Sequence, residues 1–191
     1  MAVFSFANKT YSRSMLNGNA AYDPAAMIAI ASFTATGGET SYTFSSIPQT
    51  YSSLQIWFSS RDSYSGTLLA MYGVINGDAT TNYTYHRLEG TGSSASADGS
   101  ITESNMWIPW SAGALQTSGI TGVGIIDIHD YALTTNYKTA RAFTGCDANG
   151  SGRVQMLSYL WKSTSAITSL KFSPLGTFSA GTTIHLFGIK G

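Results

Sequence analysis

The chain is 191 residues long, enough for one domain with a sizeable core, and 10% of its residues are charged, against about 25% in a typical soluble domain. Ten Lys and Arg residues balance ten Asp and Glu residues, so the formal net charge is zero. A neutral chain without a basic cluster gains little from counterion release, which argues against electrostatic nucleic-acid binding. Neutral polar surfaces repel one another weakly, so the composition favours a protein that works in a multimer or against other proteins over a charge-poor extracellular β domain.

The sequence also bears on targeting and on membranes. The N-terminus shows no basic stretch followed by a long apolar run, so we expect no signal peptide and synthesis in a cytoplasm. The most apolar run, Ala25 to Phe33, is too short to span a bilayer, and we expect no membrane partner. The single Cys146 excludes a disulfide within the chain.

The first 24 residues differ in pattern from the rest of the chain. Phe4 and Phe6 alternate with small residues only briefly, and the residues that follow have no clear period. This predicts an N-terminal arm or peripheral strand at 1–24 and one β domain at 25–191. Asp23-Pro24 fits the start of a short helix, but the β-branched and aromatic residues just beyond favour a strand.

Apolar residues alternate with other residues through most of the remaining chain, which indicates strands and not helices. In the run SLQIWFSS, Leu54, Ile56 and Phe58 share one face, while Trp57 lies on the other. Runs of this kind predict about ten or eleven short strands, at 27–35, 40–46, 53–60, 67–75, 82–90, 103–108, 122–130, 138–145, 153–161, 168–173 and 182–191.

Turn-forming residues separate these runs. Gly37-Gly38, Asn76-Gly77 and Asn149-Gly150 are typical of tight turns. Thr91 to Ser100 consists of small residues without an apolar anchor, which predicts an exposed, mobile loop. Because no helical periodicity lies between the short strands, the pattern predicts an all-β sandwich or barrel.

Asp127 and His129, in the run DIHD, are the first candidates for catalysis. On a strand they share one face about 7 Å apart, which is compatible with the start of a metal site or with a carboxylate–imidazole pair. No third partner and no serine or cysteine motif accompanies them, so we favour the alternative of a strand end that carries polar residues into a turn.

Asp147 to Gly152, with the sequence DANGSG, matches the opening of a calcium loop. The expected glutamate at the twelfth position would fall on Ser158, so a hairpin turn built on Asn149-Gly150 is the better interpretation. His86, His129 and His185 show no spacing that suits zinc. We therefore expect no catalytic residue, no metal and no cofactor.

The aromatic residues are numerous for a chain of this size. Exposed Trp and Tyr side chains can stack on sugar rings, or can form protein interfaces that are poor in charge. Most are expected to pack in the sheets, because aromatic residues suit strands. The candidates for interface or glycan contacts are Trp57, Tyr83, Tyr85, Trp107 and Trp110.

Several stretches resemble a family of small virion-associated proteins of tailed bacteriophages, including those of cyanobacteria. The resemblance covers nearly the whole chain and carries no catalytic residues. The stretches are RSMLNGNAAYDP at 13–24, TFSSIPQTYSSLQI at 43–56, INGDATTNYTYHRLEGTGSSASA at 75–97, IIDIHDYALTTNYKTARAFTG at 125–145, LWKSTSAITSLKFSP at 160–174 and the ending FGIKG.

The resemblance implies a jelly-roll-like antiparallel β-sandwich that assembles, as a trimer, onto a phage particle. The expected role is non-enzymatic: a capsid decoration (cement) protein that packs on the major capsid protein and stabilises the head. The alternative is a tail-fibre or baseplate protein, an adhesin for host carbohydrate near the Gly90–Gly99 segment. A hydrolase is a third, more distant reading. The expected location is the virion.

Overall fold

The computed structural model describes residues 26–191, which form twelve β-strands and no α-helix. No helix in this part of the chain is therefore long and apolar enough to cross a membrane. The strands are β1 (Met27–Thr34), β2 (Tyr42–Phe44), β3 (Ser53–Ser60), β4 (Leu68–Ile75), β5 (Tyr83–Gly90), β6 (Ala95–Glu103), β7 (Met106–Ala112), β8 (Gly122–His129), β9 (Lys138–Asp147), β10 (Gly152–Trp161), β11 (Leu170–Ser173) and β12 (Thr183–Ile189).

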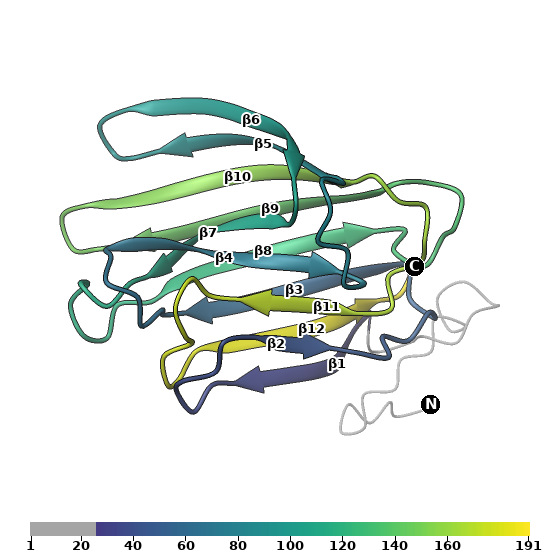
Figure 1. Cartoon of the computed structure of the whole chain (residues 1–191), viewed down its shortest axis with the longest axis horizontal. Helices are drawn as coiled ribbons and strands as arrows, with labels where there is room; N and C mark the ends of the chain where they lie inside the picture. Colours follow the sequence, from purple (N-terminus) through teal and green to yellow (C-terminus); the bar gives the residue numbers. More distant parts are fainter. Residues whose placement is uncertain (1–25) are drawn as a thin grey trace, which may run out of the picture.

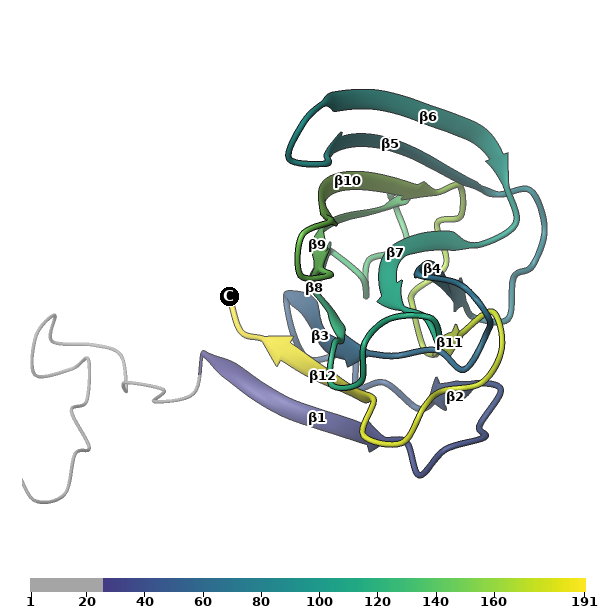
Figure 2. The same cartoon turned by 90° about the vertical axis from the view of Figure 1, so that its left-hand side faces the viewer.

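The strands form two antiparallel sheets packed face to face. The large sheet has eight strands in the order β1-β12-β3-β8-β9-β10-β5-β6, and the small sheet has four in the order β2-β11-β4-β7. Figure 1 looks onto the sheets, so that the strands of the small sheet overlap those of the large one. Figure 2 shows the two layers apart, with the large sheet curving around the small one. The outer face of the large sheet therefore has no covering layer among the described residues.

The core lies between the two sheets. Along one inner row of the large sheet, Leu186, Ile56, Ile126 and Ala142 lie opposite one another on successive strands and are all buried. They belong to one cluster with small-sheet residues such as Phe172. This inward set occupies alternate positions, as a two-residue period requires.

The expected fold class is confirmed: the chain is an antiparallel all-β sandwich. All eleven predicted strand regions overlap observed strands, although the run expected at 103–108 begins later, as β7. The jelly-roll connection order is not confirmed. The arm assigned to 1–24 lies outside the described residues.

The loop expected at Thr91 to Ser100 is a wrong prediction. Residues from Ala95 onward form β6, the edge strand of the large sheet, which pairs with β5. Nearly all of its side chains are exposed, so no face had to be apolar and the sequence shows no alternation. Only the short turn from Thr91 to Ser94 remains outside the strands, closed by a backbone hydrogen bond of 3.0 Å.

The hairpin interpretation of DANGSG is confirmed. Asn149 and Gly150 both have positive φ, at 54° and 105°, between β9 and β10. The Asp147 carboxylate accepts a hydrogen bond of 2.9 Å from the backbone N–H of Asn149. Asp147 therefore stabilises the turn.

Candidate functional site

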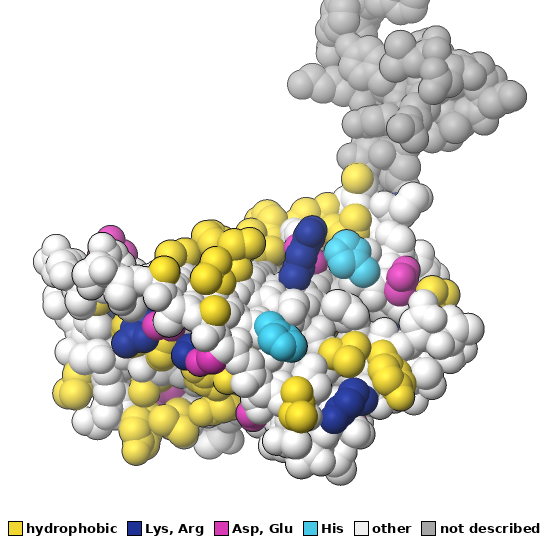
Figure 3. Space-filling view, turned by 90° about the horizontal axis from the view of Figure 1, so that it is seen from above, with side chains coloured by type: hydrophobic (Ala, Val, Ile, Leu, Met, Phe, Trp, Pro, Cys, Tyr) yellow, Lys and Arg dark blue, Asp and Glu magenta, His cyan; other side chains and the backbone are white. Residues whose placement is uncertain are grey.

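The most distinctive surface of the molecule lies on the outside of the large sheet. Seven large apolar side chains there, on strands β3, β5, β8, β9 and β10, are between 42% and 60% exposed. We call this surface the apolar face; its members are Trp57, Leu88, Val123, Ile125, Phe143, Val154 and Met156. In Figure 3, which looks down on the molecule from above, hydrophobic side chains gather along the upper edge of the domain.

Strand register brings these side chains together. Trp57 lies opposite Ile125, Ile125 opposite Phe143, Phe143 opposite Met156, and Met156 opposite Leu88. Residues in direct opposition have their Cβ atoms about 5 Å apart, so the five side chains form one continuous row across the sheet. On β6 the next residue in register is the small Ala97, opposite Leu88.

Val123 and Val154 extend the row on one side. They lie on the strands on either side of Gly145, so a position without a side chain separates them. A hollow of about 380 Å³ lies here, and its lining includes Phe143. The apolar face is therefore uneven, with a recess beside its central ring.

Phe143 also lines two further hollows. One of about 240 Å³ lies towards β5 and includes Leu88 and Met156, and one of about 630 Å³ lies towards Asp127 and Arg141. The ring, itself 56% exposed, borders all three recesses. In protein interfaces, a few large side chains that fill pockets on the partner carry most of the binding energy. Phe143, which protrudes between recesses, has this geometry.

A chain of polar contacts borders the apolar face. The indole Nε1 of Trp57 donates to the side-chain oxygen of Gln55 at 2.7 Å, and Gln55 Nε2 donates to Asp127 Oδ1 at 2.6 Å. Arg141 Nε donates to the other oxygen of Asp127 at 3.0 Å. These contacts orient the Trp57 ring and hold the one carboxylate of this border against an arginine.

A second aromatic cluster lies on the other side of the large sheet, between β5 and β7. The rings of Tyr85 and Trp107 are 5.7 Å apart, and Trp107 meets Trp110 edge-on at the same distance. The guanidinium carbon of Arg87 lies 4.9 Å from the Trp107 ring centre, and that of Arg153 lies 4.9 Å from the Trp110 ring centre. Each arginine thus makes a cation–π contact over an indole face.

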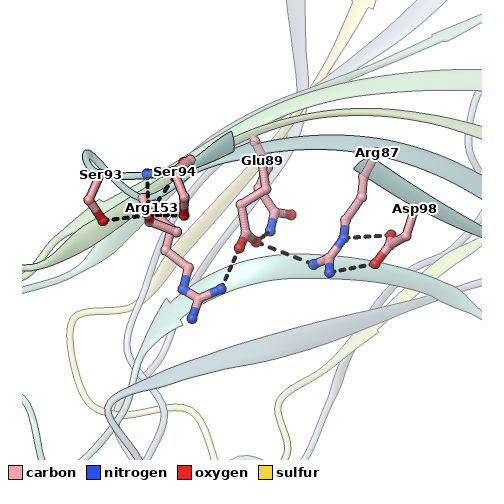
Figure 4. A network of polar contacts seen from close by, with 8 residues as sticks. Arg87, Glu89, Ser93, Ser94, Asp98 and Arg153 are labelled. Carbon is pink, nitrogen blue, oxygen red and sulfur yellow. Dashed lines mark hydrogen bonds and ion pairs between the residues drawn. The ribbon is translucent and has the colours of Figure 1, made fainter. Parts of the chain in front are cut away.

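Glu89, which is 4% exposed, connects the two arginines (Figure 4). One carboxylate oxygen pairs with Arg153, and the other accepts from Gln155 and from Arg87, the latter at 3.3 Å. Arg87 also makes two hydrogen bonds of 2.6 Å with Asp98, which raise the pKa of Arg87. Towards the end of β5, the inner face of the large sheet therefore carries an ionic network beside the apolar core.

The structure separates the five aromatic candidates. Trp57 lies on the apolar face, whereas Tyr85, Trp107 and Trp110 are half-buried in the second cluster. Tyr83 is 1% exposed and is therefore wrong as a surface candidate. Its hydroxyl donates to the backbone oxygen of Asp78 at 2.8 Å, and burial raises its pKa to about 12.

In the described part of the chain, the residues considered for catalysis or metal binding do not come together in one site. Asp127 is bound by Gln55 and Arg141, while His129 Nδ1 lies 3.1 Å from the Ser53 hydroxyl, so the two do not pair. Within residues 26–191 no three His, Cys, Asp or Glu side chains form a group that could hold a metal ion. His86, His129 and His185 lie on three different strands.

Sequence reasoning missed most of the apolar face. Phe143, Met156 and Ile125 were assigned to strands but were not singled out. The signal was present in the run GVGIIDIH, where Ile125 faces outward and Ile126 inward, so that both faces of β8 carry apolar residues. A strand that is apolar on both faces normally has a layer on each side.

No protein-family model matches the chain, and neither a curated protein nor a solved structure matches it. Fold and surface thus define an antiparallel β-sandwich with an exposed apolar sheet face.

Proposed function

We propose that this chain is a non-enzymatic structural protein that works by packing its apolar face against protein surfaces. The observation that carries the proposal is the continuous outer row from Trp57 to Leu88. Contiguous exposed apolar patches above a few hundred Å² are unusual on monomers and mark interaction sites. With 10% charged residues, the chain has few side chains that could keep such a face apart from a partner.

The contacts of two carboxylates support a non-catalytic role. Asp127 at the border of the apolar face and Glu89 in the second cluster are each held by arginine and glutamine side chains. A general acid or base needs a carboxyl group that can reach a substrate proton. Both groups instead stabilise the positions of neighbouring side chains.

We further propose that the particle is a bacteriophage virion and that the chain decorates its head. This part rests on the resemblance to small phage virion proteins, together with a surface suited to packing. A decoration protein spreads over a shell and must bind both the shell and neighbouring copies, which an extended neutral face favours. The number of three copies stays a prediction that rests on the resemblance.

Copy number tests the virion proposal. Quantitative mass spectrometry of purified phage particles that encode this chain should find it in numbers comparable with the shell subunits. A handful of copies per particle would favour a tail component. Absence from the particle would contradict a virion role.

A tail-associated adhesin is the second candidate, and the cluster of Tyr85, Trp107 and Trp110 favours it. Aromatic rings beside charged and amide side chains have the composition of a sugar-binding surface. Arg87 and Arg153, however, lie over one face of each indole, and a sugar ring would have to use another face or displace them. The decoration role is therefore the better supported of the two.

A further inference from the structure

We propose that the partner of the apolar face is a second copy of this chain, packed face to face about a twofold axis. The inference rests on the proposed function, in that it takes the apolar face to be a packing surface. It adds which protein packs against this face. Three properties of the face point to a second copy: its size, its shape and its charge.

The size of the face matches one side of a stable interface. Its seven side chains together expose roughly 700 Å², and a standard interface buries about 800 Å² on each partner. Half-buried residues at the rim, such as Phe187 beside Trp57, add to this area. Two copies facing each other would therefore bury enough surface for a specific dimer without any further contact.

The shape of the face is suited to its own copy. Phe143 and Met156 are the most exposed of the seven side chains, and they lie beside recesses of about 380 Å³ and 240 Å³. A surface that carries both a protruding group and a neighbouring apolar recess can pair with itself, because each copy supplies what the other needs. Twofold pairing uses the same patch on both chains in this way.

The charge of the face also permits self-association. The border of the row carries one acid and one base that pair with each other, Asp127 and Arg141. His185, opposite Trp57, and His86, two positions before Leu88 on β5, are neutral in the formal charge at pH 7, so two identical faces do not repel each other. The Arg141 side chain is 70% exposed although it pairs with Asp127 in its own chain. Across a twofold axis it can approach the Asp127 of the second copy, and the contact is then made twice.

Sheet geometry allows the arrangement. Large twisted sheets pack face to face at about 30° and about 10 Å apart, with side chains that interdigitate. The apolar face spans five adjacent strands, so a second large sheet would become a third layer against the sandwich. A closed twofold pair leaves no copy of the face open to further growth.

Sedimentation equilibrium of the full-length protein at micromolar concentration tests this inference. The test variant is Phe143→Thr, which removes the central ring and keeps a β-branched residue in the strand. The matched control is Leu115→Thr, at a side chain that is 66% exposed but lies outside the apolar face. Circular dichroism establishes that each variant keeps its strands, and Met156→Thr is the second test variant if Phe143→Thr does not fold.

The wild-type chain is expected to sediment as a dimer and not as the trimer that the resemblance to phage virion proteins implies. Phe143→Thr should weaken association at least tenfold, and Leu115→Thr should leave it unchanged. A monomeric wild-type chain, or an oligomer that neither test variant weakens, would overturn the proposal. A trimer that Phe143→Thr dissociates would show that the face meets a different surface, and would overturn the twofold pairing. Mass spectrometry of the phage particles is independent of sedimentation. The proposal of a dimer can therefore be refuted while the virion role is supported, and the virion role can be refuted while the dimer is supported.

Discussion

The carboxylate of Asp78 accepts a hydrogen bond of 2.8 Å from the indole Nε1 of Trp161, which joins the loop before β5 to the end of β10. Asn82 donates to the same oxygen at 2.9 Å, and Thr80 donates to the other through its backbone and side chain. Burial on its own would raise the pKa of Asp78, but these hydrogen bonds outweigh it and hold the pKa well below its usual value of 3.8. Folding is therefore linked to the ionised form.

Acid is expected to destabilise the protein through this carboxylate. Because the folded-state pKa lies below the unfolded one, its contribution is fully present above about pH 4 and is lost as the pH falls further. Glu39 acts in the same sense, since hydrogen bonds from Thr36 lower its pKa from 4.5 to about 2. Asp78→Asn should lower stability by about 1–2 kcal/mol at neutral pH and flatten the decline below pH 4.

Thermal unfolding of the variant and the wild type between pH 2 and pH 7 measures both effects. Glu103→Gln, at the half-buried end of β6, is the control that removes one carboxylate elsewhere. An acid decline in Asp78→Asn as steep as in the wild type would contradict the assignment.

The buried network around Glu89 predicts a large loss of stability when the carboxylate is removed. Glu89→Ala removes the carboxylate that Arg153, Arg87 and Gln155 share. Arg87 keeps its two hydrogen bonds to Asp98, whereas Arg153 and Gln155 lose their acceptor. Removing one partner of a buried ion pair typically costs about 3–5 kcal/mol. Because the Arg153 side chain is 39% exposed and can be hydrated, we expect a smaller loss here, of about 2–3 kcal/mol. Urea unfolding of the variant against the wild type measures the difference.

Asp98→Asn is the matched control, because Asp98 pairs with the same Arg87 but is exposed, on the edge strand β6. An exposed pair contributes about 1 kcal/mol or less. Equal losses in the two variants would mean that the burial of Glu89 does not determine the strength of the network.

The sandwich was predictable because every described strand except β6 contains buried residues, and burial of one face forces a two-residue alternation into the sequence. Leu54, Ile56 and Phe58 in β3 show this clearly. The edge strand β6 was not predictable, since the backbone of β5 alone specifies its pairing and its side chains meet solvent. Small residues such as Ala97 and Gly99 look the same in a loop and in such a strand.

The candidate site was predictable only in part, because it depends on register across strands. Trp57 was identified from its residue type, but its neighbours Ile125 and Phe143 come from strands far along the chain. A strand pattern does not say which residues of two strands lie opposite each other. The surface prediction for Tyr83 was wrong for a different reason. A tyrosine suits the core as well as the surface when its hydroxyl has a hydrogen-bond partner.

The second aromatic cluster gives a direct test of the adhesin alternative. Because Arg87 and Arg153 lie over the indoles of Trp107 and Trp110, neutral oligosaccharides should leave the intrinsic fluorescence unchanged. Titration with a panel of host-surface oligosaccharides at millimolar concentration is the measurement. A saturable change in emission that Trp107→Ala abolishes, and that Trp57→Ala leaves in place, would favour the adhesin over the decoration role.

The segment before β1 is expected to be dispensable for folding and to be required for assembly. Among residues 26–191 the buried cluster draws its members from Phe33 onward, and β1 pairs with β12 from Met27, so these residues form a core among themselves. A chain that starts at Ala25 should therefore melt within about 4 °C of the full-length protein, equivalent to roughly 1 kcal/mol for a domain of this size. It should also bind less well to phage particles stripped of the protein, since chain termini often become ordered only on a partner.

Differential scanning calorimetry and a pelleting assay measure the two effects separately. Failure of the shortened chain to fold would place Phe4 and Phe6 in the core, and undiminished binding would remove the assembly role of the segment.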